Sequence, residues 1–268
     1  MQRPFLRGAR PLAFAHRGGS KLWPENTLEA FEGAVGLGFD YLETDAHLTC
    51  DGVVVLHHDA RIDRTTDSTG SVDELTFGEL SRADAGYRFT PDGRTFPYRN
   101  QGLRIPSFEE VIERFPNVNF NVEIKQGSPS MARALWALIE RHRLHDRILV
   151  AAGDDALGRE FDALSCGRVA RSPGVRGVLR FWAAARAGLT RHLPISYDVL
   201  QVPARHLGLT VVDRRFIEAA HAQGLHVHVW TIDHPSEMRR LIELGVDGLM
   251  TDRPDRLASL LGLAPRPA

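Results

Sequence analysis

Cysteine is scarce in this sequence, which contains only Cys50 and Cys166. The two residues are far apart, and neither belongs to a Cys-x-x-Cys pair. Structural zinc sites and disulfide-stapled scaffolds need several cysteines at short, regular spacings. The scarcity therefore argues against both classes of protein, and we interpret the two cysteines as ordinary free thiols.

Long apolar runs and an excess of one charge sign are also missing. No apolar run reaches the roughly 18 residues that a membrane-spanning helix requires, and the first residues hold no apolar segment of signal-peptide length. We therefore expect a cytoplasmic protein without a transmembrane segment. The formal net charge is −1, whereas a nucleic-acid-binding domain usually has a strongly basic face. We expect no nucleic-acid partner.

What the sequence does contain is an alternation of short apolar segments with helical patterns, from one end to the other. This alternation is typical of a parallel sheet with helical crossovers. The strand candidates are Leu12–Ala15, Tyr41–Asp45, Asn119–Ile124, Arg147–Ala151, Arg168–Ala170, Val199–Val202, Leu225–Thr231 and Asp247–Thr251. With a length of 268 residues, the pattern predicts an α/β fold of the (β/α)8 TIM-barrel type, in one domain over residues 1–268.

Helical patterns follow most of these strand candidates. Asn26 is the expected N-cap of the first helix, and Ser107 with Glu110 has the spacing of a capping box that opens a later one. Further helices are predicted over Met131–His142, Ala156–Leu164, Arg214–Gln223 and Glu237–Leu244.

Residues 60–106 interrupt this rhythm. They are rich in Asp, Thr, Gly and Arg, and only Leu75–Leu80 has a short helical pattern. An irregular segment of this length inside a compact domain is usually functional. We therefore predict a small insertion after the second strand region that acts as a lid.

Three acidic residues stand at the ends of strand candidates. Glu43 and Asp45 are two apart in one strand, so their side chains point to one face; Glu123 ends the next strand, and Lys125 shares its face. Converging carboxylates repel one another unless a cation holds them, and an all-oxygen set favours Mg2+ or Ca2+. The pattern indicates one divalent cation. The alternative is that Glu43 and Asp45 pair with arginines in a structural network.

Two histidines follow strands on the same expected rim. His16 and Arg17 come directly after the first strand, and His58 and Asp59 follow the extended stretch Val53–His57. Imidazole titrates near neutrality, so a pair of histidines suits a reaction that needs one proton donor and one acceptor. Arg17 offers a forked donor for phosphate.

The order of these residues along the chain is their most specific property. His16-Arg17 precedes Glu43-x-Asp45, and His58-Asp59 follows. The segments around them are Ala15-His-Arg-Gly-Gly19, Pro24-Glu-Asn-Thr27, Asn121-Val-Glu-Ile-Lys125, Val229-Trp-Thr-Ile-Asp233 and Gly245-Val-Asp-Gly-Leu-Met-Thr-Asp-Arg-Pro254. In these segments and their order, the sequence resembles the glycerophosphodiester phosphodiesterase family across almost the whole chain.

The resemblance implies a (β/α)8 barrel that binds one divalent cation, Ca2+ or Mg2+. It implies that His16 and His58 are the general acid and base, without saying which is which. It assigns the metal to Glu43, Asp45 and Glu123.

The resemblance also implies roles around the metal. Arg17 and Lys125 match the positions that contact phosphate, and Trp230 matches an aromatic residue at the rim of the pocket. The insertion at residues 60–106 matches a segment that lies over the mouth of the family's active site.

The activity implied by the family is metal-dependent hydrolysis of glycerophosphodiesters to glycerol 3-phosphate and an alcohol, a reaction of lipid and glycerol metabolism. The expected partner is a small phosphodiester. One alternative is lysophospholipase-D-like cleavage of a lipid that keeps an acyl chain. Another is a barrel that binds phosphodiesters without catalysis.

Two positions depart from the family pattern. Asp233 stands where asparagine is more frequent, and Ala151-Ala-Gly153 stands where a serine-containing turn is common. Both lie toward the alcohol side of the substrate, so they affect which alcohol is accepted more than cleavage itself.

His57 precedes His58 in the same extended stretch, and because neighbouring side chains point to opposite faces of a strand we expect His57 to be structural.

One basic stretch raises the question of membrane contact. Gly177–Leu193 alternates arginines with large apolar residues, which is typical of a helix that lies on a membrane surface. The ordinary interpretation is a barrel helix with its apolar face on the sheet and its arginines outside. Weak membrane-surface contact through residues 177–193 is therefore one hypothesis for this segment.

Overall fold

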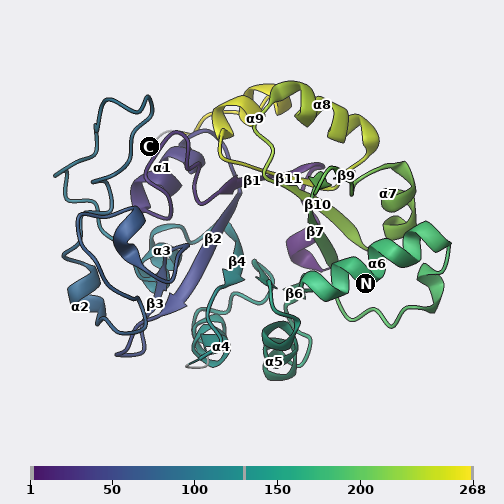
Figure 1. The fold of residues 1–268 in the computed structure, drawn as a ribbon, viewed down its shortest axis with the longest axis horizontal. Helices are drawn as coiled ribbons and strands as arrows, with labels where there is room; N and C mark the ends of the chain where they lie inside the picture. The colour runs from purple at the N-terminus through teal and green to yellow at the C-terminus, as the bar shows by residue number, and fades with distance from the viewer. Residues whose placement is uncertain (1–2, 129–130, 267–268) are drawn as a thin grey trace.

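Eight parallel strands form the centre of the structure, a computed structural model that describes residues 3–128 and 131–266 (Figure 1). Their order around the sheet is β6-β5-β4-β2-β1-β11-β10-β7. A hydrogen bond from the Asp198 amide to the Arg171 carbonyl, 2.9 Å long, connects the two end strands. The strands are β1 (Leu12–His16), β2 (Tyr41–Leu48), β4 (Asn119–Ile124), β5 (Ile148–Ala152), β6 (Ala170–Arg171), β7 (Val199–Pro203), β10 (His226–Trp230) and β11 (Gly248–Thr251). The predicted (β/α)8 barrel is confirmed.

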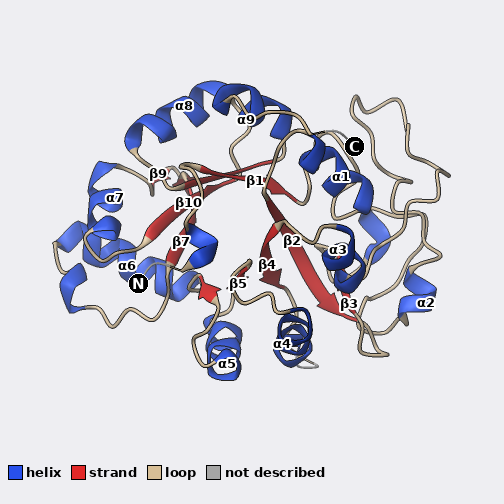
Figure 2. Ribbon diagram, turned by 180° about the vertical axis from the view of Figure 1, so that it is seen from behind, coloured by secondary structure: helices blue, strands red, loops and turns tan. Residues whose placement is uncertain are grey.

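Helices surround this barrel on the outside (Figure 2). Those that follow barrel strands are α1 (Leu28–Gly36), α4 (Met131–His142), α5 (Asp155–Ser165), α6 (Val175–Ala187), α7 (Arg214–His221), α8 (Pro235–Leu244) and α9 (Pro254–Leu261), with α3 (Phe108–Arg114) before β4. Thr27, not Asn26, is the N-cap of α1, because its side chain accepts from the Ala30 amide. The capping box of Ser107 and Glu110 at α3 is confirmed.

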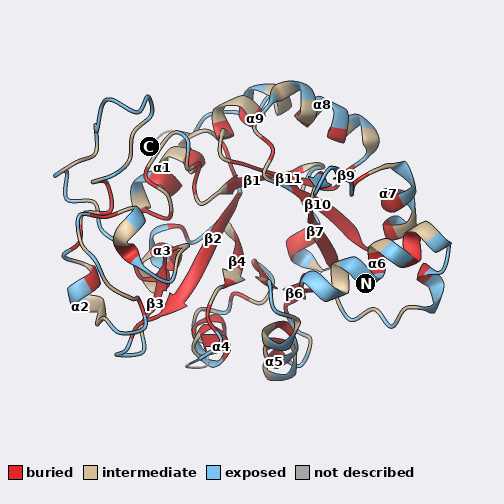
Figure 3. Cartoon of the chain, in the orientation of Figure 1, coloured by how far each residue is buried: buried red, intermediate tan, exposed pale blue. Residues whose placement is uncertain are grey.

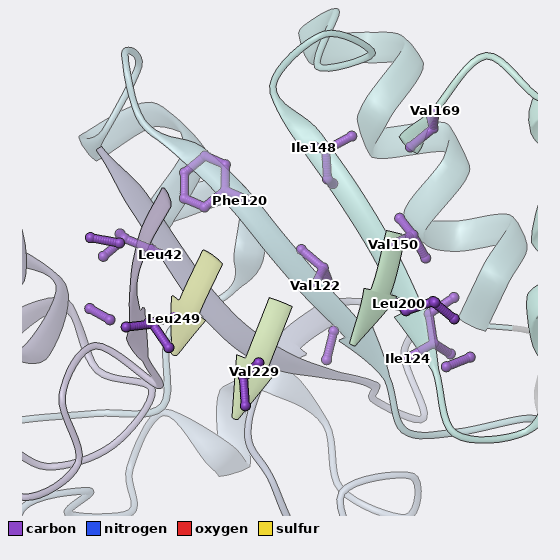
Figure 4. Packing of buried hydrophobic residues seen from close by; sticks show 14 of the residues in the cluster. Leu42, Phe120, Val122, Ile124, Ile148, Val150, Val169, Leu200, Val229 and Leu249 are labelled. Carbon is purple, nitrogen blue, oxygen red and sulfur yellow. The ribbon is translucent and has the colours of Figure 1, made fainter. Parts of the chain in front are cut away.

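Alternation along each strand divides the core into two layers. Leu42, Phe120 and Leu249 belong to the outer apolar cluster, which also contains side chains of the helices; Figure 4 shows part of it. The strands are largely buried (Figure 3). Phe14 and Tyr41 point inward and, with N-terminal residues, form a second apolar cluster inside the barrel. Because one set of side chains fills the outer layer, the alternate residues of β2 and β4 are directed into the barrel.

The predicted insertion begins after a short strand that lies outside the barrel's ring of eight. This strand, β3 (Val54–Leu56), pairs antiparallel with the end of β2. Residues 60–106 then follow an irregular path with a 3-10 helix (Ile62–Arg64) and one short α-helix, α2 (Phe77–Leu80). Their apolar side chains, among them Ile62 and Val72, form a small cluster of their own. In the described part of the chain, no helix is both long and apolar enough to cross a membrane.

Candidate active site

The carboxyl ends of β2 and β4 bring three acidic side chains together. Asp45 is the register partner of Glu123 across the two strands, and Glu43 points to the same side from one pleat earlier. One carboxylate oxygen from each of the three residues lies within 4.8 Å of the others. Glu43 and Asp45 are buried, whereas Glu123 is partly exposed. The structure thus gathers the residues that the sequence assigned to a metal.

Two cationic side chains surround this acidic group. The Lys125 Nζ lies 3.1 Å from an Asp45 oxygen and 2.9 Å from a Glu123 oxygen. The Arg17 Nε lies 3.1 Å from the other Asp45 oxygen, and the Arg17 amide donates to Glu43 at 3.0 Å. Arg17 reaches this position because the chain turns sharply after β1, where Arg17 itself has a φ of 52°.

Burial and charge shift the pKa values of these carboxyl groups in opposite directions. Burial, assisted by the charges of Asp45 and Glu123, raises the pKa of Glu43 above its usual value. Burial acts in the same sense on Asp45, but Lys125 and Arg17 outweigh it and lower the pKa of that group. Neighbouring cations therefore stabilise the ionised form of Asp45, whereas they offset the effect of burial on Glu43 only partly.

His16 stands at the end of β1, beside the acidic group. Its Nδ1 is 2.6 Å from an Asp252 oxygen, and its Nε2 is 3.7 Å from Glu43. Burial disfavours the imidazolium, but Glu43 and the hydrogen bond with Asp252 outweigh it and raise the pKa of His16 to about 9. Asp252 thus orients the ring and leaves Nε2 directed toward the carboxylates.

His58 is oriented in the same manner from the other side. Its Nδ1 is 2.6 Å from an Asp59 oxygen. Asp59 in turn accepts from the Arg64 Nε at 2.5 Å. Burial by itself would raise the pKa of Asp59, but the hydrogen bonds from Arg64 and His58 outweigh burial and lower this pKa to about 2. A carboxylate therefore holds Nδ1 of each predicted catalytic histidine, which leaves Nε2 for a substrate.

The remaining predicted residues are placed less centrally. Trp230 ends β10 and is 42% exposed, at the rim but without a described contact to the acidic group. His57 is buried and bonded to the Asp59 carbonyl and to Thr65, as expected for a structural residue. A side chain at Gly153 would place its Cβ 3.9 Å from Glu123, so the departure at this turn does border the site.

Four residues support the site, and sequence reasoning gave no role to three of them (Asp252, Glu25 and Arg64), whereas it placed Asp233 on the alcohol side. Asp252 orients His16, and Asp233 accepts from the Asp252 amide at 2.8 Å. Glu25 and Arg64 connect Arg17 to the His58 side. Asp252, Asp233 and Glu25 lie inside the quoted motifs, and that position could have indicated a supporting role. Arg64 lies in the insertion, where no periodic pattern indicates its position.

The donor set fits a hard divalent cation. It consists of carboxylate oxygens, the ligands that Mg2+ and Ca2+ prefer. Burial is the main cause of the raised pKa of Glu43, and the charges of Asp45 and Glu123 add to it; a divalent ion bound there would compensate that charge. Together with Lys125 and Arg17, such a site is suited to binding an anionic phosphodiester and to moving protons through two oriented imidazoles.

Comparison with known proteins identifies the family of this chain. The sequence profile of the Glycerophosphoryl diester phosphodiesterase family matches residues 16–256. A Probable glycerophosphodiester phosphodiesterase 2 from Mycobacterium tuberculosis is 34% identical over 96% of this chain and 93% of its own. A Glycerophosphodiester phosphodiesterase from Caldanaerobacter subterraneus is 31% identical, over 94% of this chain and 98% of its own. A Lysophospholipase D from Mus musculus is 28% identical over 92% of this chain and 85% of its own.

Solved structures resemble the fold closely. A glycerophosphoryl diester phosphodiesterase domain from Mycobacterium tuberculosis superposes with a TM-score of 0.79 at 23% identity, covering 94% of this chain and 98% of that one. A phosphodiesterase from Oleispira antarctica, solved with the product sn-glycerol-3-phosphate, gives a TM-score of 0.76 at 24% identity, with 94% and 97% covered.

Proposed function

Because this chain belongs to the glycerophosphoryl diester phosphodiesterase family and is a phosphodiesterase, we propose that it hydrolyses glycerophosphodiesters to glycerol 3-phosphate and an alcohol. Catalysis uses His16 and His58 as the acid/base pair. Glu43, Asp45 and Glu123 hold one divalent cation, Mg2+ or Ca2+. The observation that carries the proposal is the convergence of these three carboxylates within 4.8 Å beside a histidine that is itself oriented by a carboxylate.

The two histidines divide the proton transfers between them. One imidazole takes a proton from the nucleophile, and the other gives a proton to the leaving alcohol. The nucleophile is water or a hydroxyl of the substrate's own glycerol, which would give a cyclic phosphate. In either case Nε2 exchanges the proton, because Asp252 and Asp59 occupy the two Nδ1 atoms.

Charge stabilisation comes from the chain and from the cation. Arg17 and Lys125 lie against the acidic group and are placed to bind the phosphodiester oxygens. A bound divalent ion supplies Lewis-acid stabilisation of the phosphoryl charge. Trp230 contributes an apolar face at the rim for the rest of the substrate.

Residues 60–106 are proposed to be the lid over this site. Arg64, which belongs to the segment, binds Asp59 and Glu25, so the insertion is tied to the His58 side of the barrel. A segment held in this way limits which alcohol groups reach the phosphorus.

The decisive experiment is turnover of glycerophosphocholine, with glycerol 3-phosphate detected by a coupled enzyme. Release that depends on added Mg2+ or Ca2+ and stops with EDTA supports both the reaction and the cation. Release that continues unchanged in EDTA contradicts the role of the cation. No release with glycerophosphocholine, combined with metal-dependent cleavage of bis(p-nitrophenyl) phosphate, keeps the site and contradicts the substrate.

A second candidate substrate is a lysophospholipid. The exposed apolar face of Trp230 at the rim would suit an acyl chain, and one relative bears the name Lysophospholipase D. Release of choline together with lysophosphatidic acid would support this reaction, whereas glycerol 3-phosphate would support the first.

A further inference from the structure

Exposed apolar side chains are concentrated at one part of the barrel rim. Within residues 3–128 and 131–266, seven large hydrophobic side chains are exposed. Five of them lie at or after the carboxyl ends of the neighbouring strands β6, β7 and β10. These five, here named the rim apolar patch, are Val175, Leu179, Leu207, Leu209 and Trp230. The patch lies on the same rim as the candidate active site.

A hairpin presents the most exposed of these residues. It consists of β8 (Arg205–His206) and β9 (Leu209–Thr210), which pair antiparallel after β7. At its tip, Leu207 has a φ of 47° and is 88% exposed. A leucine is uncommon in the left-handed region and gains nothing from full exposure to water. Both features are unfavourable for a free hairpin, which indicates that the tip is adapted to contact something.

The base of the hairpin is fixed to the barrel. Arg186 of α6 donates to the Thr210 carbonyl at 3.2 Å and pairs with Asp213. The tip is therefore held out from the rim by a supported base and not by a loose loop.

Two of the segments that form the patch, the start of α6 and the hairpin, carry charge of one sign. Residues 172–184 and 203–212 contain no Asp or Glu, but they contain Arg176, Arg180 and Arg205, all of which are exposed. Leucines beside arginines match a lipid surface, where apolar side chains enter the interface and guanidinium groups meet anionic head groups. Binding to a lipid surface requires only exposed apolar side chains and positive charge, whereas a protein partner would also need an acidic, apolar surface of complementary shape.

The rest of α6 is already used for packing. Phe181 and Ala185 are buried, and Trp182 packs against the core. The helix begins at Val175 and ends at Ala187, and its large exposed apolar side chains, Val175 and Leu179, both lie in its first two turns. The hairpin adds two further exposed apolar side chains, Leu207 and Leu209.

We propose that the rim apolar patch docks the enzyme on an anionic phospholipid bilayer, with the mouth of the barrel toward the head groups. The inference extends the proposed function, since phosphodiesters of glycerol are the chemistry of that surface. Binding to the bilayer is nevertheless measured without any turnover.

The test is sedimentation with sucrose-loaded vesicles of phosphatidylcholine containing about one-fifth phosphatidylglycerol, at low salt. The wild-type protein is expected to sediment with these vesicles and to stay in solution with pure phosphatidylcholine. The variant Leu207→Asp with Leu209→Asp should bind at least ~10-fold more weakly, because two apolar anchors are replaced by charges that the lipid repels. The matched control is Leu189→Asp, which changes an exposed leucine (50% exposed) that follows α6 and does not belong to the patch.

The results of sedimentation either support or overturn docking on the bilayer. Loss of binding in the hairpin variant, with retention in the control, supports the proposal. No binding by the wild type, equal binding by all three proteins, or binding to lysophospholipid micelles but not to bilayers overturns it. Turnover of glycerophosphocholine without vesicles should be equal in all three. If that turnover is absent while the binding difference holds, the proposed function fails and the docking surface stands.

Discussion

Arg64 binds both carboxylate oxygens of Glu25, with Nη2 2.6 Å from Oε1 and Nη1 3.0 Å from Oε2. The same guanidinium holds Asp59, the partner of His58. Glu25 also accepts from Arg17, 3.2 Å away. One residue of the insertion therefore connects the acid/base side of the site with its phosphate-binding side.

The first prediction concerns this connection. Replacing Arg64 by Ala should lower kcat by about 10-fold, because Asp59 and Glu25 lose the donor that orients them. Arg61→Ala is the matched control, since it removes an exposed arginine of the same segment that pairs only locally with Asp63. Steady-state kinetics with both variants, alongside melting temperatures, makes the comparison. Equal kcat values for the two would show that the bridge has no part in positioning.

The second prediction concerns the histidines. His16→Ala and His58→Ala should each lower kcat by at least ~100-fold, the typical loss of a general acid or base. His145→Ala serves as control, because that histidine pairs with Glu140 on a surface away from the site. Near-normal turnover by either catalytic variant would remove that residue from the acid/base pair.

Much of this site was predictable because strand ends obey simple geometry. Period-two alternation placed Glu43 and Asp45 on one face, and parallel strands brought Glu123 to the same rim. The sequence also predicted α4 with its observed ends, Met131–His142. Local periodicity and strand order were sufficient for these features, since neither depends on distant contacts.

Two of the missed features, the N-cap of α1 and the role of Arg64, depend on tertiary contacts, whereas the missed α9 has local signals in Pro254 and Gly262. Asn26 has the composition of an N-cap, but its amide donates to Asp45 at 3.0 Å, so the cap moves to Thr27. The final helix, α9 (Pro254–Leu261), was not predicted. Arg64 lies in an irregular segment where position in the chain says little about position in space. Such residues become visible only when the strands they support are assembled.

The third prediction concerns the cation. Mg2+ or Ca2+ at about 100 times its dissociation constant should stabilise the protein by roughly 2.7 kcal/mol, because only the folded chain gathers the carboxylates. Asp45→Asn should abolish the rise in melting temperature, whereas Glu113→Gln, an exposed residue of α3, should keep it. Differential scanning calorimetry with and without each ion measures this. An unchanged melting temperature in the wild type would argue against a metal at Glu43, Asp45 and Glu123.

The fourth prediction is a loss of stability in mild acid. Burial is the main cause that lowers the pKa of His226 to about 4 and that of His228 well below its ordinary value of 6.5. Around His226, Asp247 and Asp198 favour the imidazolium, whereas Arg10 and His221 disfavour it. Both histidines take up protons on unfolding below pH 6.5, so the free energy of unfolding should fall between about pH 6.5 and pH 4.

His228 allows this pH dependence to be checked. Its ring is fully buried against Phe14, and neither of its nitrogens has a hydrogen-bond partner among the described residues. His228→Phe should therefore flatten the decline, whereas His192→Phe, a change at an exposed histidine, should not. Urea titrations across this pH range provide the free energies. A decline as steep in His228→Phe as in the wild type would assign the effect to other groups.

The last prediction contrasts two glycines that the sequence does not distinguish. A Cβ at Gly248 in β11 would lie 2.7 Å from a ring carbon of His228 and 2.9 Å from Phe14. A Cβ at Gly36 in α1 would meet no atom within 4 Å. Gly248→Ala should therefore destabilise the protein by about 1–3 kcal/mol through overpacking, whereas Gly36→Ala should stabilise it by about 0.5–1 kcal/mol through the helix preference for alanine. Denaturant unfolding of the two variants measures both changes, and the same sign for both would contradict the packing described inside the barrel.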